Sequence, residues 1–505
     1  MNRFRKLLVM IFLLTPWWMS SVAFAQQVEE RIVINFKGDK LPADLEAQIQ
    51  AAGGVLVNTL PQVGIAVAVS ADPNFTSVIA TGADVISVGA MPFYVLPAMG
   101  GEAIEEGPTD ADVHYDYGNG ILWGINRVHA PDAWKVKCHP DRKGCTGSHQ
   151  TVVAVIDTGI AWNHPDLAPN VIDKKCYRYV KEEGETPAHV DDSCDPYPAA
   201  GEICSPLPFP PPGRVPCLEF NHGTHVAGTI AAAFGGGGYV GVGPNLALVS
   251  YKVSQVDPDL GKLVAYPDIV WKAMIDAADK GYEVINFSWG WMYPDGFGGP
   301  GSNNMAAYVQ AHKQNAKYVN KQGSVIVASA GNVNEGGLNV NGTTIVLPAD
   351  LPQVIGVSAT GIRPEPKYPW PGSYDVLPFY SNYGASGVSL AAPGGDCGKD
   401  WCDPSSKDSS EAPYRIASTA VELANPACRT AKPPTCPPAL LAWGGTSMAT
   451  AHVSGVIGLV RDANPNLTPN QVEALIKTTA DDLGDHQSFG HGMVNAYEAV
   501  MKAVR

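Results

Sequence analysis

Short, continuously apolar segments rich in β-branched residues recur along most of this chain, with helical segments between them. Amphipathic stretches such as "DIVWKAMIDAADKG" separate the apolar runs, which are "TVVAVID", "LALVSYKV", "YEVINFSWG", "SVIVASAGN" and "QVIGVSAT". A strand that is apolar on both faces is buried between two layers, and strands joined by helices pair in parallel. The sequence therefore predicts an α/β domain of three layers with a mostly parallel central sheet.

Polar residues follow three of these runs. Asp157 ends "VVAVID", Ser288 follows "VINF", and Asn332 follows "VIVASAG". In open parallel sheets, ligand chemistry gathers at the carboxyl ends of the strands. We therefore expect the functional site near these three turns.

The segment that precedes these runs has a different pattern. From Arg31 to about Pro97 the order strand, helix, two strands, helix, strand predicts a small α+β unit. The stretch "AMGGEAIEEGPTDAD" that follows is Gly-rich and acidic, with little apolar periodicity. It is predicted to be a linker and a cleavage zone.

The first 25 residues have the features of a secretory signal peptide. Arg3, Arg5 and Lys6 precede the apolar run "LLVMIFLL", and "AFA" at residues 23–25 offers a cleavage site. A membrane anchor is the weaker interpretation, because a bilayer needs roughly 20 apolar residues. We expect an exported product.

All ten cysteines lie beyond that segment. An even number of cysteines in an exported chain favours disulfides. Zinc binding is the alternative, but the spacings contain no paired C-x-x-C. Cys138 and Cys145, like Cys397 and Cys402, are close enough in the sequence to pair locally.

Two Pro-rich, cysteine-bearing insertions interrupt the alternation of strands and helices. They span residues 176–217 and 397–436 and have no sustained amphipathic period. Both are predicted to be long loops stapled by disulfides.

The formal net charge is −15, and the sequence contains no basic stripe or polybasic tail. An acidic surface repels nucleic acid and anionic membranes. Neither is therefore expected as a partner.

Ser447 stands in "GGTSMATAHVSG", ahead of small residues typical of a buried helix. Unpaired N–H groups point outward at the first turn of such a helix, so this position offers a nucleophile and a donor for an oxyanion. The hydroxyl needs a histidine base that a carboxylate holds in turn. For this serine alone, the alternative is a helix N-cap.

The candidate bases are His222 and His225 in "FNHGTHVAGTIAAAF", of which His222, ahead of the helix, is freer to reach a neighbour. Histidines three residues apart also chelate metals, although the glutamate and third ligand of the usual zinc helix are not evident nearby. Asp157 is the candidate to orient a histidine, while Asp-Thr-Gly turns also have ordinary structural roles.

Together these stretches resemble the subtilisin-like serine protease (subtilase) family in its order Asp, His, Ser. Three match the active-site blocks of that family: "VIDTGI", "HGTHVAGT" and "GTSMATAHVSG". Secondary blocks follow in sequence order, namely "INFSWG", "SAGN", "FYSNYG" with "AAPGG", and "GHGMVNA". The resemblance runs from Leu122 to the C-terminus, outside the two insertions.

By this resemblance Asp157 is the orienting carboxylate, His222 the general base and acid, and Ser447 the nucleophile. Asn332 in "SAGN" matches the side-chain donor of the family's oxyanion hole. The backbone N–H of Ser447 is its expected companion.

The resemblance implies protein or peptide substrates, bound as an added strand along Ser288, Trp289 and Gly290 and near Ala330 and Gly331. Trp289 stands where many relatives carry a smaller aliphatic residue. It either narrows a subsite or packs in the interior.

Ala451 departs from the family pattern, because relatives commonly carry proline four residues after the nucleophile. Alanine has an N–H that can bond the carbonyl of Ser447, and proline has none. We expect the nucleophile to shift slightly toward the helix while hydrolysis survives.

The resemblance also divides the chain. Residues 1–25 are the signal peptide, residues 26–105 resemble the inhibitory and chaperone propeptide, of α+β ferredoxin-like fold, and residues 106–505 form the catalytic domain. Asp166 in "HPDL" matches a calcium ligand of some relatives, but the glycines of "FGGGGYVGVGP" offer only backbone carbonyls to such a site. Catalysis is expected to need no cofactor, with structural calcium left open.

The sequence thus predicts an exported, disulfide-stapled serine endopeptidase that is made as a preproenzyme, cleaves itself and forms an acyl-enzyme intermediate. We expect a monomer outside the cell or in the periplasm, without a membrane anchor, and with its own propeptide as inhibitor. The alternatives are an inactive subtilase-like binding or adhesion protein, and a metal-dependent hydrolase that uses His222 and His225.

Overall fold

The computed structural model describes residues 30–95, 101–104, 122–180, 189–197, 221–235, 238–257, 262–292, 302–333, 337–341, 344–365, 368–396, 415–422, 425 and 436–505. The predicted signal peptide and most of the predicted linker lie outside these ranges. Within them, none of the helices combines the length and the apolar character that a membrane crossing requires.

In the described part of the chain, eight strands form the central sheet in the order β19-β18-β16-β14-β7-β11-β8, with β20 beside β18. Every neighbouring pair is parallel except β18 with β19. The predicted mostly parallel sheet is confirmed. Its strands are β7 (Val152–Asp157), β8 (Val171–Cys176), β11 (Ala247–Lys252), β14 (Val284–Phe287), β16 (Val325–Ser329), β18 (Val354–Glu365), β19 (Tyr368–Val376) and β20 (Leu390–Pro393).

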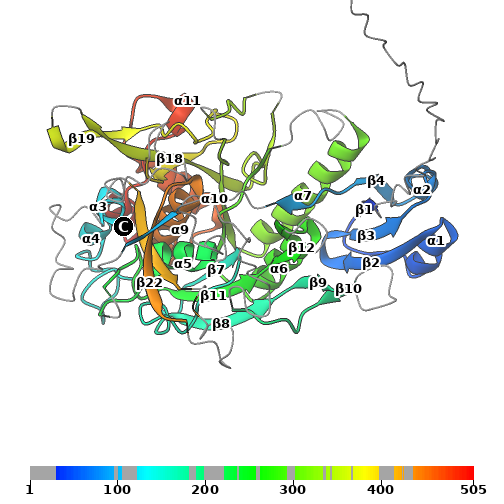
Figure 1. Cartoon of the computed structure of the whole chain (residues 1–505), viewed down its shortest axis with the longest axis horizontal. Helices are drawn as coiled ribbons and strands as arrows, with labels where there is room; N and C mark the ends of the chain where they lie inside the picture. The colour runs from blue at the N-terminus through cyan, green and yellow to red at the C-terminus, as the bar shows by residue number, and fades with distance from the viewer. Residues whose placement is uncertain are drawn as a thin grey trace, which may run out of the picture.

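Helices cover both faces of this sheet (Figure 1). Because successive side chains of a strand point to opposite faces, Val153 and Val155 of β7 enter one core, and Ala154 and Ile156 enter the other. The first core contains α5 (His222–Ala231), α9 (Thr446–Ala463), α10 (Pro469–Thr478) and α12 (Ala496–Ala503), and the second contains α6 (Pro267–Asp279) and α7 (Asn303–Lys321). The three predicted layers are therefore present.

Short-range signals in the sequence set the helix ends. Thr468 caps α10 by accepting from the backbone N–H of Gln471, whose side chain accepts from the backbone N–H of Thr468. Pro469 then occupies the first helical position, where no intrahelical donor is lost.

Among the described residues, three short helices complete the set of helices in the domain that contains the central sheet: α3 (Trp123–Arg127), α4 (Ala130–Ala133) and α11 (His486–Phe489).

The N-terminal unit has the predicted α+β pattern. Its antiparallel sheet, in the order β2-β3-β1-β4, carries α1 and α2 on one face and packs its other face into the core of α6 and α7. Figure 1 shows this unit, in blue, at one end of the molecule against α7. Its elements are β1 (Glu30–Phe36), α1 (Leu45–Ala51), β2 (Gly54–Leu60), the 3-10 turn Pro61–Val63, β3 (Ile65–Ser70), α2 (Phe75–Ile79) and β4 (Val85–Ala90).

Two further strands extend from this unit onto the domain that contains the central sheet. β5 (Tyr94–Val95) pairs antiparallel with β13 (Lys262–Ala265), which forms a hairpin with β12 (Ser254–Asp257). β6 (Gly101–Ile104) pairs antiparallel with β22 (Pro438–Trp443), the strand just ahead of α9. The chain therefore docks on two separate edges, one on each side of residues 96–100.

The prediction of loops is wrong for parts of both insertions. β9 (Arg178–Val180) and β10 (His189–Asp191) form a hairpin that the Cys176–Cys194 disulfide ties to the end of β8. β21 (Ile416–Val421) pairs with β22 and is entirely buried. β9 and β10 are three residues each, too short for a periodic pattern, and β21 mixes polar and apolar residues in "IASTAV", so long-range pairing stabilises all three. The suggested Cys397–Cys402 pair lies outside the described residues.

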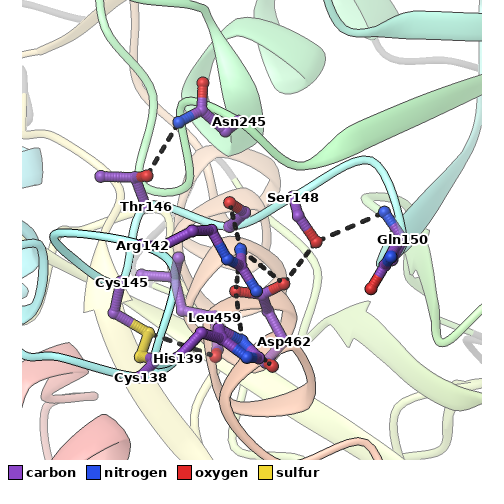
Figure 2. Close-up of polar contacts among 11 residues, drawn as sticks. Cys138, His139, Arg142, Cys145, Thr146, Ser148, Gln150, Asn245, Leu459 and Asp462 are labelled. Atoms are coloured by element: carbon purple, nitrogen blue, oxygen red, sulfur yellow. Dashed lines mark hydrogen bonds and ion pairs between the residues drawn. A yellow bond between two sulfur atoms is a disulfide. The ribbon is translucent and has the colours of Figure 1, made fainter.

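A disulfide-closed loop holds the C-terminal end of α9 (Figure 2). Cys138 and Cys145 are bonded, as their spacing predicts. Arg142 Nη1 lies 2.9 Å from Asp462 Oδ2, and the Ser148 hydroxyl donates to Asp462 Oδ1 at 2.6 Å. Only 2% of the Asp462 side chain is exposed, so its charge depends on these partners.

Removing the Asp462 carboxylate is expected to destabilise this end of α9. The Asp462→Ala variant leaves Arg142 without its buried partner, and breaking a buried ion pair from one side costs about 3–5 kcal/mol. Arg142 is 25% exposed, so we expect the free energy of unfolding in urea to fall by about 2–3 kcal/mol. Asp132→Ala is the control, since Asp132 pairs with exposed Lys135 at 2.8 Å, a contact worth at most about 1 kcal/mol. Equal losses of stability in the two variants would show that the contacts of Asp462 do not hold this end of α9.

Candidate active site

The imidazole of His222 is hydrogen-bonded to the carboxylate of Asp157. Asp157 is the last residue of β7, and His222 is the first residue of α5. His222 Nδ1 lies 2.8 Å from Asp157 Oδ1 and 2.9 Å from Oδ2, and both residues are buried. A carboxylate only accepts, so Nδ1 carries the proton and Nε2 keeps its lone pair. The structure thus brings together two of the three residues of the predicted set.

The turn after β7 fixes this geometry. Thr158 N donates to Asp157 Oδ1 at 2.7 Å, and Gly223 N donates to the Thr158 hydroxyl oxygen at 2.9 Å. A Cβ on Gly223 would lie 2.5 Å from the carbonyl oxygen of Gly159. The first turn of α5 therefore sits directly on the β7 turn, which only glycine at position 223 permits.

Two indole rings flank His222. The centroid of the Trp443 ring lies 6.0 Å from that of His222, and the Trp289 ring lies 6.4 Å away. Trp289 Nε1 approaches Nδ1 to 3.4 Å, but Nδ1 already donates to Asp157, so this is a packing contact. Trp289 also packs on Phe287 and is 6% exposed, which favours interior packing over a role in narrowing a subsite.

The alternative of a metal pair at His222 and His225 has no support in this geometry. His225 Nε2 lies 3.0 Å from Ile416 O and 3.1 Å from Leu441 O, so it is a donor to two backbone carbonyls. Burial lowers the pKa of His225 to about 3. Among the described residues, no group of three or more His, Cys, Asp or Glu side chains is arranged to hold a metal, and this includes the surroundings of Asp166.

Ser447 is in the first turn of α9 and exchanges hydrogen bonds with Ser288, which follows β14. The Ser447 hydroxyl donates to Ser288 O at 2.7 Å, and the Ser288 hydroxyl donates to Ser447 O at 2.9 Å. Asn286 Nδ2 donates to Ser288 Oγ at 3.0 Å, and the Ser454 hydroxyl donates to Asn286 Oδ1 at 2.9 Å. These four side chains fix the start of α9 against the end of β14.

Ser447 and His222 approach from facing elements without joining. Within the described part of the chain, no hydrogen bond links these two side chains, because the Ser447 hydroxyl is bound to Ser288 O. The neighbours of Ser447 nevertheless contact His222: Trp289 follows Ser288, and Trp443 lies four residues before Ser447. A change of the Ser447 χ1 rotamer would free its hydroxyl from Ser288 O.

Asn332 contacts the residue before the serine. Its Oδ1 accepts from Thr446 N at 3.0 Å and from the Thr446 hydroxyl at 2.9 Å. Two donors on the oxygen fix the amide orientation, so Nδ2 is the atom directed elsewhere. An N–H donor therefore stands at the N-terminus of α9, beside Ser447.

The residues predicted to bind a substrate backbone lie together. A Cβ on Gly290 would lie 2.2 Å from Ser329 O and 3.1 Å from Gly331 N, so residues 288–290 and residues 329–331 are in contact. Ala330 O accepts from Asn382 Nδ2 at 2.8 Å, and Gly331 O accepts from Asn382 N at 3.0 Å. Asn382 thus holds residues 330–331 in place beside residue 290, and their contact with a substrate backbone stays a prediction.

Several contributors to the site were missed from the sequence. β13 pairs with β5 and is an edge that accepts an extended chain. Asn286, Ser454 and Trp443 hold or flank the predicted residues. The one available signal was Asn286, a polar residue inside the buried strand "VINF".

Ala451 is fully buried in α9. The sequence predicts that its N–H reaches the carbonyl of Ser447. In the structure the Ser288 hydroxyl donates to that same carbonyl at 2.9 Å, so Ser288 restrains the backbone of Ser447. The expected shift of Ser447 stays a prediction.

Comparisons with known proteins agree with this architecture. The family model described as the subtilase family, peptidase S8, matches residues 148–492. Fervidolysin from Fervidobacterium pennivorans is 30% identical over 392 residues, which are 75% of this chain and 44% of that protein. M-protease from Shouchella clausii is 26% identical over 487 residues, which are 95% of this chain and 94% of that protein. The chain thus spans less than half of fervidolysin and nearly all of M-protease.

Solved structures show the same fold. The epidermin leader peptide processing serine protease from Staphylococcus aureus matches with a TM-score of 0.62 at 20% identity, over 95% of this chain and 99% of that one. Crystalline fervidolysin matches with a TM-score of 0.57 at 24% identity, over 94% of this chain and 61% of that one. The family model covers most of the chain, which therefore belongs to the subtilase family.

Proposed function

We propose that this chain hydrolyses peptide bonds in proteins with Ser447 as nucleophile, His222 as general base and acid, and Asp157 as the group that orients His222. The observation that carries this assignment is the bond from His222 Nδ1 to Asp157. It leaves the Nε2 lone pair to accept the proton of a serine hydroxyl. Peptide hydrolysis by these side chains needs no metal or other cofactor.

Substrate binding releases the nucleophile in this proposal. The Ser447 hydroxyl donates to Ser288 O, and an extended peptide that lies along residues 288–290 offers its own N–H to the same oxygen. The peptide N–H replaces the hydroxyl, which then turns toward His222 Nε2. A chain in the site therefore favours the rotamer in which the nucleophile faces its base.

Attack of Ser447 Oγ on the carbonyl carbon places negative charge on the carbonyl oxygen, which Asn332 Nδ2 and the backbone N–H of Ser447 receive. His222 passes the proton from Ser447 to the leaving amine, and the C–N bond breaks to leave an acyl-enzyme. Water then attacks the ester through the same base. Asn332 is preorganised for this role because Thr446 holds its oxygen.

We further infer that the chain is exported with residues 1–25 as a signal peptide and is held inactive by its N-terminal unit. β5 lies on β13 and β6 lies on β22, on either side of residues 96–100. β22 leads directly into the segment that carries Ser447. These two strand pairings support the inference that the N-terminal unit places residues 96–100 in the cleft, as a substrate or product would lie.

Covalent labelling tests the nucleophile. A fluorophosphonate probe is expected to label the processed enzyme at Ser447, which peptide mass spectrometry detects. The reason is that only an activated hydroxyl displaces fluoride from the probe. Ser447→Ala is expected to lose labelling and peptidase activity together. Ser386→Ala, at an exposed position, is the control and is expected to retain both. Unlabelled Ser447 in processed protein would favour a binding protein instead.

The polar network behind Ser447 is expected to affect catalysis more than binding. Asn286→Ala removes the partner of both Ser288 and Ser454, so kcat on a peptide substrate is expected to fall about tenfold with little change in KM. Val284→Ala in the same buried strand is the control, because it creates a cavity without touching Ser288. An equal fall of kcat in both variants would show that Asn286 acts only by stabilising the fold and does not position Ser288.

The bond cut on maturation is expected between Val95 and Gly101, because strands on either side of that segment are docked. N-terminal sequencing and intact mass of the processed enzyme identify the new terminus. The Ser447→Ala chain is expected to stay full length. A first cut beyond Ile104, in the acidic linker, would show that β6 does not mark the far side of the cleft.

A further inference from the structure

Arg31 of the N-terminal unit is clamped between two tyrosines of the catalytic domain. Its guanidinium carbon lies 3.7 Å from the centroid of the Tyr179 ring and 4.4 Å from that of Tyr266. The two rings are 5.2 Å apart and nearly perpendicular, at 87°. The cation therefore sits in the corner between two aromatic rings and contacts both, an arrangement that favours arginine over a neutral side chain.

A buried carboxylate is bound to the hydroxyl of Tyr179, one of the two cage residues. Asp268, in the first turn of α6, is fully buried. Its Oδ2 accepts from Asn58 Nδ2 at 2.7 Å and from the Tyr179 hydroxyl. Its Oδ1 has no hydrogen-bond partner among the described residues. Such a carboxylate favours a positive neighbour.

The cage walls belong to the catalytic domain and do not depend on Arg31. Tyr179 lies in β9, which the Cys176–Cys194 disulfide anchors, and its backbone N–H donates to Gln255 Oε1 at 2.7 Å. Tyr266 connects β13 to α6, and its hydroxyl donates to Asp257 Oδ2 at 3.4 Å. Departure of the N-terminal unit removes Arg31 and Asn58 and leaves two tyrosine rings, one of which is bound through its hydroxyl to a buried carboxylate.

The cage lies beside the path of a chain that enters the cleft. The backbone of Tyr94 pairs with Ala265, the residue before Tyr266. Met91, three residues earlier, donates its N–H to Arg31 O at 2.7 Å. A peptide that follows β13 as β5 does therefore brings a side chain to the cage a few residues before it reaches Ala265.

We propose that in the mature enzyme Tyr179, Tyr266 and Asp268 form a subsite for an arginine or lysine side chain of a protein substrate, several residues N-terminal to the cleaved bond. The proposal rests on the proposed function, because the N-terminal unit must leave before the cage is open. Arg31 occupies the subsite until then and contributes to inhibition by the same contacts. The net charge of −15 further favours cationic segments.

The test compares peptides that differ in one charge. Fluorogenic peptides carry either arginine or citrulline, its uncharged isostere, at single positions from the fourth to the tenth residue before the cleaved bond. With processed wild-type enzyme, arginine at one position is expected to lower KM about three- to tenfold relative to citrulline, at unchanged kcat. The difference is expected to shrink in high salt, because the attraction is electrostatic.

Variants assign the effect to the cage. Tyr179→Leu and Asp268→Asn are each expected to abolish the difference between arginine and citrulline while cleavage of a peptide without basic residues continues. Tyr497→Leu, a half-exposed tyrosine on α12, is the control and is expected to preserve it.

Equal KM values for arginine and citrulline at every position, in wild-type enzyme that cleaves the reference peptide, would overturn the subsite alone. This comparison needs no variant, so a folding defect in Tyr179→Leu does not affect it. Failure to cleave the reference peptide after processing would overturn the proposed function and the subsite with it.

Discussion

The contact on which the site depends is the bond between His222 and the buried carboxylate of Asp157. An ionised side chain with no exposed surface is unfavourable unless donors surround it, and here the donors are the backbone of Thr158 and the imidazole itself. The two donors reach Asp157 only if β7 ends in the middle of a parallel sheet and α5 starts directly beside that end. The register of β7 with β11 and β14 is therefore also what sets the tautomer of His222.

The helix that carries Ser447 is fixed at both ends by polar contacts and between them by apolar packing. At its start the side chains of Ser288, Asn286 and Ser454 link it to β14. At its far end Asp462 accepts from Arg142, in the loop that Cys138 and Cys145 close, and from Ser148 just after that loop (Figure 2). Hydrogen bonds add direction to a packed helix, which can otherwise slide or rotate by small amounts. If Ser447 is the nucleophile that we propose, it must meet its base to within a fraction of an ångström and needs that restraint.

The sequence carried most of the fold and the main residues of the site, because those signals are local. The strands of the central sheet are apolar runs, the α+β unit follows from alternating patterns, and Asp157, His222, Asn332 and Ser447 stand in recognisable turns. Contacts made only by distant pairing left no such mark. β21 is a strand because β22 lies beside it, β9 because a disulfide and a partner hold it, and the bond from Ser447 to Ser288 O depends on a side-chain rotamer. Only Asn286, polar within an apolar strand, hinted at the network behind the serine.

The interface of the N-terminal unit combines apolar packing with polar contacts, a combination that allows the unit to separate from the rest of the chain. Val33 and Val67 pack in the same core as Ala307 of α7, so docking removes apolar surface from water. Around them, Asn35 donates to Ala307 O at 2.8 Å, Asn58 donates to Asp268, and Arg31 fills the tyrosine cage. Each of these groups is well hydrated when alone, so separation costs less than that of a purely apolar interface, while the pairing specifies one docked arrangement. In the function that we propose, this unit blocks the cleft and is later removed, which requires both properties, and its departure uncovers the polar and aromatic surface that we propose receives a basic side chain.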